Sequence, residues 1–431
     1  MTMDGKVIVS WASALALVSV TLGETLTFKG ETDKNPLAYK VGEKMTFTVS
    51  LVDKDAKNAP VKGRKLVWKF SGDDGASSKG EATSDEPLVL STSISKPGFV
   101  RLTVNVLDQK GKVLKGKAEK FDGGAGANVA EIESLSEPAD FDDFWAKQLV
   151  AVSSLKGEVK FGENHSKAKL QPWCAIRRRG YVVRTFELPM GDGERPATGL
   201  VAWPEGAQPK SLKLKVRFFG YGWGQTSFLG GDFKPDTLAL AVTRHGEETD
   251  READYYTNLK TNVLSGFCFR RTNRPETTDQ LKMLLRDWRA IRWAKTLPEW
   301  NGSDLTVTGG SMGGFQSLAM AALDKSVTSA VVTIPWHACI YGKAKFGRMG
   351  GWFPAWTEAL GYFDTANFAK RITCSVDMTI GLGDYTCPPS GEMVLYRNLK
   401  GPKKLTAKQN MGHGAIYGVE TKVYTFKGDL E

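Results

Sequence analysis

Two patterns of apolar residues divide the chain into two parts. Between about residues 25 and 121, apolar and polar residues alternate in short segments separated by clusters of turn-forming residues. This alternation, without any long helical pattern, is typical of a small antiparallel β-sandwich of the immunoglobulin-like type. Beyond residue 138, short apolar runs alternate with helical stretches, of which the clearest spans 278–296. The second part therefore predicts an α/β domain built on a mostly parallel sheet.

The segments before and between these parts predict export and a linker. After Lys6, a mostly apolar run continues to Leu22, which has the length and flanks of a secretory signal peptide; the alternative is a buried first strand. No other segment is long and apolar enough to cross a bilayer, so we expect a secreted or periplasmic protein without stable membrane insertion. The glycine-rich stretch 123–127 is typical of a domain boundary. The predicted divisions are a signal peptide at 1–23, an immunoglobulin-like sandwich at 24–122, a linker at 123–137 and an α/β domain at 138–431.

The charged residues, cysteines and histidines limit the partners, metal sites and catalytic bases that this chain can have. The 431 residues include 58 Lys and Arg against 48 Asp and Glu, but the signs are interleaved and the densest basic cluster, 177–179, is short. This distribution disfavours nucleic acid as a partner. The five cysteines contain no C-x-x-C pair and no zinc-site spacing, so we expect no metal and no disulfide framework, with a single Cys374–Cys387 bridge left open. Four histidines are candidates for an imidazole base: His165, His245, His337 and His413.

The strongest chemical signal is the segment 305–315, LTVTGGSMGGF. It contains G-x-S-x-G, with a predicted strand before it and a small-residue helix after it. In a nucleophile elbow the serine lies on a strained strand-to-helix turn, where glycines two residues on either side tolerate the crowding. The motif therefore predicts Ser311 as a nucleophile, beside a helix N-terminus that favours developing negative charge.

A nucleophilic serine needs a base and a carboxylate, which in this arrangement follow it in the order Ser, Asp, His. His413, in Met-Gly-His-Gly, is the histidine that comes late in the chain. Asp384 follows the predicted strand 376–382 at its carboxyl end, where such sheets hold their sites. We therefore predict a Ser311–His413–Asp384 triad. The weaker candidates are Asp377 and Asp364 for the acid and His337, His245 and His165 for the base, and we interpret His337 as structural.

An acyl-transfer serine also needs two backbone donors for the oxygen of the tetrahedral intermediate. One should be the N–H of Met312, directly after the nucleophile, and the other should come from a loop after an early strand. The segment 218–224, FFGYGWG, fits because glycines let the backbone approach a ligand closely. We nominate the N–H of Tyr221.

These segments together resemble the acetyl xylan esterase and cephalosporin C deacetylase family. The resemblance rests on the aromatic-Gly-Tyr-Gly loop, the helix end at 293–298 (WAKTLP), the elbow, the Gly-Leu-Gly-Asp-x-x-Cys-Pro-Pro run and the terminal Gly-His-Gly. It extends from about residue 141 to the C-terminus and excludes the sandwich. The run from 383 to 389 is its most specific part.

The resemblance implies an α/β-hydrolase fold and removal of acetyl groups from xylo-oligosaccharides without metal or cofactor, often by homo-oligomers that are ring-shaped hexamers. Carried over, Ser311 is the nucleophile and His413 the general base and then acid. Asp384 orients His413, and Tyr221 and Met312 donate to the oxyanion.

The sequence departs from the family pattern at two positions and in its length. Met312 stands where the family usually has glutamine, a mild change because a backbone amide serves the oxyanion. Phe219 stands where the family usually has histidine, which alters the polarity of the pocket. The added sandwich counts against the usual hexamer.

The resulting interpretation is a secreted esterase that deacetylates carbohydrate through an acetyl-enzyme. Trp352 and Trp356 lie where these folds insert lid segments; a sugar ring could stack on either, although packing between lid and core is the favoured reading. One rival is a prolyl-oligopeptidase-like peptidase, which needs a propeller that this N-terminal region is too short to supply. The other is a non-catalytic carbohydrate-binding protein on a hydrolase scaffold, against which the intact triad residues argue.

Overall fold

The computed structural model describes residues 25–114, 120–164, 180–223, 230–249, 251–414 and 421–430. The predicted signal peptide at 1–23 lies outside the described residues and stays a prediction. His165, Cys174 and the basic cluster 177–179 also lie outside them.

The N-terminal β module (residues 26–127) consists of two four-stranded sheets. One has the order β1-β2-β3 with β6 paired to β2, and the other has the order β5-β4-β7-β8. Inward-facing residues such as Phe28, Phe47, Phe70 and Phe121 share one apolar core. The assignment of this module to the immunoglobulin-like class stays a prediction. Its strands are β1 Leu26–Thr32, β2 Met45–Asp53, β3 Ala59–Pro60, β4 Lys65–Gly72, β5 Ser77–Thr83, β6 Leu88–Thr92, β7 Gly98–Val106 and β8 Lys120–Ala127.

The α/β domain is built on a ten-stranded sheet of order β18-β17-β16-β15-β14-β12-β13-β11-β10-β9. The strands from β13 to β17 along this order pair in parallel, as expected, while β9, β10, β11 and β18 pair antiparallel at the two ends. Parallel strands carry their carboxyl ends to one edge, where the loops can meet. The bounds are β9 Lys160–Asn164, β10 Tyr181–Leu188, β11 Ala197–Pro204, β12 Leu212–Arg217, β13 Thr237–Val242, β14 Trp300–Gly310, β15 Ser329–Thr333, β16 Ser375–Gly381, β17 Lys403–Lys408 and β18 Val423–Lys427.

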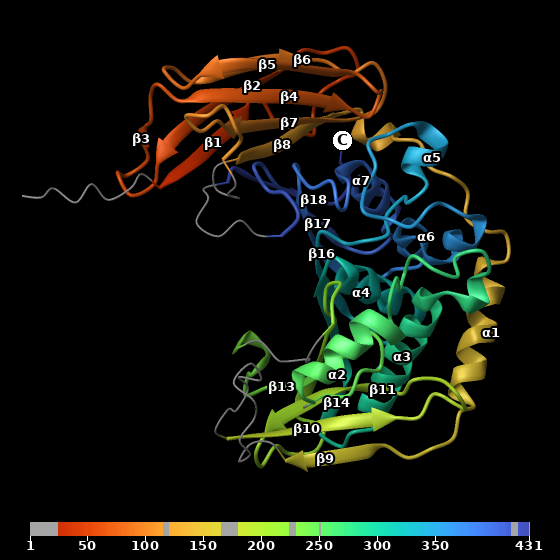
Figure 1. Ribbon diagram of the computed structural model, residues 1–431. Coiled ribbons are helices and arrows are strands. Elements are labelled where there is room, and N and C mark those ends of the chain that lie inside the picture. The colour runs from red at the N-terminus through yellow and green to blue at the C-terminus, as the bar shows by residue number, and fades with distance from the viewer. Residues whose placement is uncertain are drawn as a thin grey trace, which may run out of the picture.

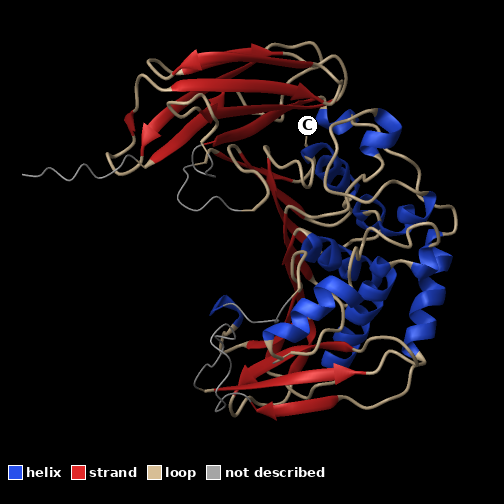
Figure 2. Ribbon diagram, in the orientation of Figure 1, coloured by secondary structure: helices blue, strands red, loops and turns tan. Residues whose placement is uncertain are grey.

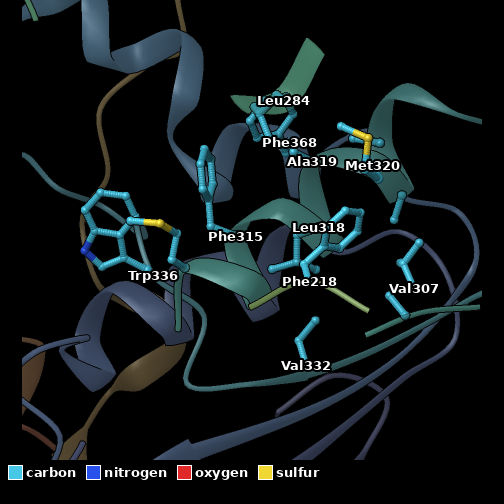
Figure 3. Close-up of a cluster of buried hydrophobic side chains, with 14 of the residues drawn as sticks. Phe218, Leu284, Val307, Phe315, Leu318, Ala319, Met320, Val332, Trp336 and Phe368 are labelled. Atoms are coloured by element: carbon cyan, nitrogen blue, oxygen red, sulfur yellow. The ribbon is translucent and has the colours of Figure 1, made fainter. Parts of the chain in front are cut away.

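Helices pack beside this sheet, whereas the N-terminal module is built of strands (Figure 2). The predicted helix at 278–296 is α3, and Thr278 caps it by accepting a hydrogen bond from the N–H of Leu281 at 3.1 Å. Helix α4 is buried on all faces, and its Phe315 and Leu318 lie among side chains of neighbouring elements (Figure 3). The helices are α1 Phe141–Ser153, α2 Ala253–Asn258, α3 Asp279–Ala294, α4 Met312–Leu323, α5 Gly342–Phe346, α6 Thr365–Ala369 and α7 Pro389–Asn398. None of the helices in the described ranges is long and apolar enough to cross a membrane.

The predicted linker at 123–137 is wrong over its first part, because Gly123–Ala127 belong to strand β8 and are buried. A short 3₁₀-helix, Val129–Glu131, follows. The glycines are needed for close packing rather than flexibility: a Cβ on Gly124 would lie 2.6 Å from the carbonyl oxygen of Leu382. Strand β8 therefore joins the module directly to the α/β domain. Figure 1 shows the module beside the end of the large sheet that holds β16, β17 and β18.

Candidate active site

Ser311 lies in the tight turn between strand β14 and helix α4. Its backbone angles, φ 55° and ψ −120°, fall outside the regions that residues with a side chain ordinarily adopt. The predicted crowding is present, since a Cβ on Gly309 would lie 2.4 Å from the carbonyl oxygen of Gly313. The N–H of Ser311 donates to the carbonyl oxygen of Thr333, and the N–H of Trp336 donates to that of Ser311, both at 2.9 Å. Hydrogen bonds on both sides of the serine thus hold a strained turn in place.

The loop after β12 approaches the serine through a glycine. A Cβ on Gly220 would lie 3.9 Å from Cβ of Ser311, so the peptide that joins Gly220 to Tyr221 lies beside the nucleophile. Nε of Arg244 donates a hydrogen bond to the carbonyl oxygen of Gly220. Because a trans peptide is planar and its C=O and N–H point in opposite directions, this bond also fixes the direction of the Tyr221 N–H.

Met312 is the first residue of α4, so its N–H has no partner within the helix. The Ser311 side chain does not cap the helix. The Met312 side chain is fully buried, and the glutamine-to-methionine departure therefore puts a sulfur side chain in the core while the amide stays at the helix N-terminus. Both nominated donors, Tyr221 and Met312, adjoin the serine.

Asp384 and His413 form a hydrogen-bonded pair. His413 Nδ1 lies 2.9 Å from Asp384 Oδ2, and a carboxylate accepts, so Nδ1 carries the proton and leaves Nε2 as the acceptor. The other carboxylate oxygen, Oδ1, accepts from the N–H of Thr386 at 2.8 Å and of Cys387 at 3.0 Å. Asp384 is fully buried, whereas the His413 side chain is 32% exposed. The pair therefore joins a fixed carboxylate to an imidazole within reach of solvent.

The Ser311 hydroxyl lies beside the thiol of Cys387. Burial raises the pKa of the Cys387 thiol, the nearby Asp384 carboxylate raises it further, and a hydrogen bond with Ser311 lowers it in part. Within the described ranges, no hydrogen bond joins Ser311 to His413.

Asp384, Cys387 and His413 also form a group whose ligand atoms lie within 4.8 Å of one another, close enough to hold a metal ion. The Cys387 thiol shares a hydrogen bond with Ser311, and Asp384 and His413 are hydrogen-bonded to each other, so these groups are already paired. The hydrogen bond between Asp384 and His413 fits a base and its orienting carboxylate better. The four described cysteines are free, so the bridge left open between Cys374 and Cys387 does not form.

His337 and His245 are both buried. Nδ1 of His337 lies 3.0 Å from the carbonyl oxygen of Phe363, and burial lowers the pKa of His337 to about 4. Burial and neighbouring arginines hold the pKa of His245 well below its usual value. Both imidazoles are therefore neutral near pH 7, and His337 has the structural role that its position in the sequence suggested.

Aromatic residues surround the oxyanion loop. The ring of Tyr221 stacks on Phe267 with centroids 4.6 Å apart and meets the edge of Trp352 at 4.5 Å. Trp352 also contacts Phe269 at 4.6 Å and is 38% exposed. Trp352 therefore combines packing with a free face. Trp356 lies elsewhere, against Tyr341, and lines a cavity of about 580 Å³ between α5 and the start of α7.

Sequence reasoning missed Arg244 and the residues of the β module that reach this site. Arg244 follows strand β13 at its carboxyl end, which was the available signal. Its guanidinium lies 5.2 Å from the ring centre of Phe219, the residue that replaces the usual histidine. The module residues contact the loops of Asp384 and His413, and no local pattern marks them.

Comparisons with known proteins identify the family of the α/β domain. The acetyl xylan esterase family model matches residues 132–345 and 355–430. The acetyl esterase Axe7A of Xylanibacter ruminicola is 28% identical over 291 residues, which is 62% of this chain and 61% of that protein.

Solved structures support the fold. An acetyl xylan esterase from a Paenibacillus species aligns with a TM-score of 0.54 and 22% identity, over 67% of this chain and 94% of the other. Acetyl xylan esterase 1 from a Thermoanaerobacterium species gives 0.53 and 20%, over 67% and 93%. The large domain therefore has an α/β-hydrolase-type fold, and the chain belongs to the acetyl xylan esterase family.

Proposed function

We propose that the protein is a serine esterase that removes acetyl groups from xylan or xylo-oligosaccharides. The observation that carries the proposal is the 2.9 Å hydrogen bond between His413 and Asp384, on the loops after adjacent strands β17 and β16. Family membership and the strained turn at Ser311 support the same reading. The Xylanibacter relative is named an acetyl esterase, which supports acetyl as the group that is removed.

The chemistry proceeds in two halves. Ser311 Oγ attacks the acetyl carbonyl carbon while His413 Nε2 takes its proton, and the N–H groups of Tyr221 and Met312 stabilise the resulting oxyanion. The imidazolium, stabilised by Asp384, returns the proton to the departing sugar hydroxyl. Water then repeats the sequence on the acetyl-enzyme and releases acetate. The exposed face of Trp352, beside Tyr221, offers a surface on which a xylose ring stacks.

Hydrolysis of acetylated xylo-oligosaccharide, p-nitrophenyl acetate and a prolyl peptide tests the proposal. We expect the wild type to hydrolyse both esters, and Ser311→Ala to lose at least about 10⁴-fold of that activity because the nucleophile is gone. Ser303→Ala, at an exposed serine of β14, is the matched control and should match the wild type. Peptide cleavage would favour a peptidase, and a wild type inactive on all three substrates would overturn the proposal.

A further inference from the structure

The edge of strand β8 is covered by side chains from the loop that carries His413. The carboxamide of Gln409 accepts from the N–H of Gly124 at 2.9 Å and donates to the carbonyl oxygen of the same residue at 2.7 Å. Oδ1 of Asn410 accepts from the N–H of Asp122 at 3.0 Å. Both amide side chains are fully buried. They pair with backbone groups of β8 that a further strand would otherwise satisfy, and they lie just before His413 in the chain.

The loop that carries Asp384 touches the same strand through its backbone. A Cβ on Gly383 would lie 2.1 Å from the carbonyl oxygen of Asp122. The N–H of Gly383 donates to the carbonyl oxygen of Met411 at 3.0 Å, so the two catalytic loops are also joined to each other. Strand β8 therefore contacts both loops where they meet.

An ion pair within the module stiffens this part of β8. Arg101 binds Asp122 through two hydrogen bonds, at 2.7 and 2.6 Å, and Lys120 binds it at 2.6 Å. Paired hydrogen bonds between arginine and a carboxylate fix the relative orientation of the two groups. The Arg101 guanidinium lies 4.5 Å from the ring centre of Tyr385, the residue after Asp384. The same side chain thus contacts the acid loop and orients Asp122.

Away from β8 the module meets the α/β domain through the buried Asp73, whose Oδ1 accepts from the N–H of Met349 at 3.0 Å, and through the long side chain of Lys96. Nζ of Lys96 donates to the carbonyl oxygen of Phe346 at 2.9 Å, away from the catalytic loops. Such a flexible contact attaches two surfaces without setting the position of a backbone. The close backbone approach found at Gly124 and Gly383 requires accurate positioning.

We propose that strand β8 sets the positions of the acid and base loops, with Gln409 and Asn410 as positioning residues for the Asp384–His413 pair. The N-terminal module is then part of the esterase machinery. This inference rests on the proposed function, since it assigns a role within that reaction.

The test compares Gln409→Ala with Lys96→Met in the full chain. Each substitution removes hydrogen bonds between the module and the α/β domain, but only Gln409 lies beside the catalytic loops. The measurements are kcat and KM on p-nitrophenyl acetate, and the rate and final extent of labelling of Ser311 by a fluorophosphonate. For Gln409→Ala we expect kcat and the labelling rate to fall about 10- to 100-fold, because small misplacement of catalytic groups carries such a cost. KM and the final extent of labelling should stay near wild-type values, and Lys96→Met should match the wild type.

A purely structural role predicts a lower extent of labelling with an unchanged rate per labelled site, and that result would overturn the inference. Equal kinetics for Gln409→Ala and Lys96→Met would also overturn it. Should the alanine variant fail to fold, Gln409→Met keeps the length of the side chain without introducing a charge and removes both hydrogen bonds to Gly124, and we expect the same pattern. An inactive wild type, or an active Ser311→Ala, overturns the proposed function instead, so the two failures are distinguishable.

Discussion

The two sides of the candidate active site are supported by different parts of the chain. On the nucleophile side, Ser311 and the loop at Gly220 are held by contacts within the α/β domain, including the hydrogen bond from Arg244. On the acid–base side, the loops of Asp384 and His413 meet strand β8 of the N-terminal module. One side is therefore self-contained, and the other depends on a second layer of structure.

The two sides also differ in how far their supporting residues lie within the part of the chain that matches the family. The family match begins at residue 132, after β8 ends at Ala127. All three predicted triad residues lie inside the match, yet part of the support for two of them lies before it. The N-terminal module is thus integrated with the site rather than simply attached to the domain. The predictions below test this division, beginning with the largest effect.

Replacing the carboxylate should damage the acid–base side most. In Asp384→Asn the side-chain oxygen can still accept from the Thr386 N–H, but the new amide donates toward His413 and favours the wrong imidazole tautomer. We expect kcat on p-nitrophenyl acetate to fall about 10³- to 10⁴-fold with little change in thermal midpoint. Asp377→Asn is the control, because it changes a partly exposed carboxylate of the preceding strand β16. An Asp384→Asn enzyme of normal kcat would remove Asp384 from the triad.

The local features of the nucleophile side were predictable from sequence. Ser311 was recognisable because Gly309 and Gly313 lie only two positions from it in the chain and the crowding that requires them is local. Likewise, apolar periodicity locates α3 almost to its ends. Such signals lie within one strand, turn or helix, so a single sequence carries them.

The acid–base support was not predictable, for a physical reason. Glycines at 123 and 124 indicate flexibility when no neighbour is known, but here they permit backbone contact with residues more than 250 positions away. Gln409 pairs with Gly124 across 285 positions, and nothing near either residue reports the other. Arg244 was missed similarly, because its carbonyl partner belongs to a separate loop.

The nucleophile side contains a buried neutral histidine that should make it sensitive to acid. His337 has a pKa of about 4 in the folded protein against 6.5 when exposed, so the unfolded chain binds the proton first as pH falls. Stability from this group is fully present above pH 6.5 and is lost between 6.5 and 4, by about 3 kcal/mol. Urea unfolding at pH 7 and pH 4 should show this extra loss in the wild type and not in His337→Gln, whose neutral amide can still donate to the Phe363 carbonyl.

The difference between the two proteins is the informative quantity, because other groups titrate in the same range. Burial raises the pKa of Asp364 to about 6, and this carboxyl gains stability as pH falls, in the opposite sense to His337. Asp364 is present in both proteins and cancels. Equal losses in wild type and His337→Gln would show that His337 is not the acid-sensitive group.

Arg244 tests how the oxyanion loop on the nucleophile side is held in place. Arg244→Met removes the donor that fixes the Gly220 carbonyl, so the Tyr221 N–H should no longer be held in the direction of the oxyanion. We expect kcat to fall about 10-fold, which is less than the loss caused by removing an oxyanion donor completely. KM should change little, because an oxyanion forms only beyond the ground state, and a boronic acid that mimics it should bind correspondingly less tightly. Unchanged boronate affinity would separate Arg244 from the oxyanion loop.

Combining Arg244→Met with Gln409→Ala completes the comparison. The two side chains share no hydrogen-bond partner within the described residues, and each acts on a different catalytic group. Each loss of kcat corresponds to an increase in activation free energy. If the two sides are separately supported, the increases in the two single variants should sum to that of the double variant within about 0.5 kcal/mol. A double variant much less damaged than this sum would mean that both substitutions disturb one common unit. The β module would then support the whole catalytic centre rather than its acid–base side alone.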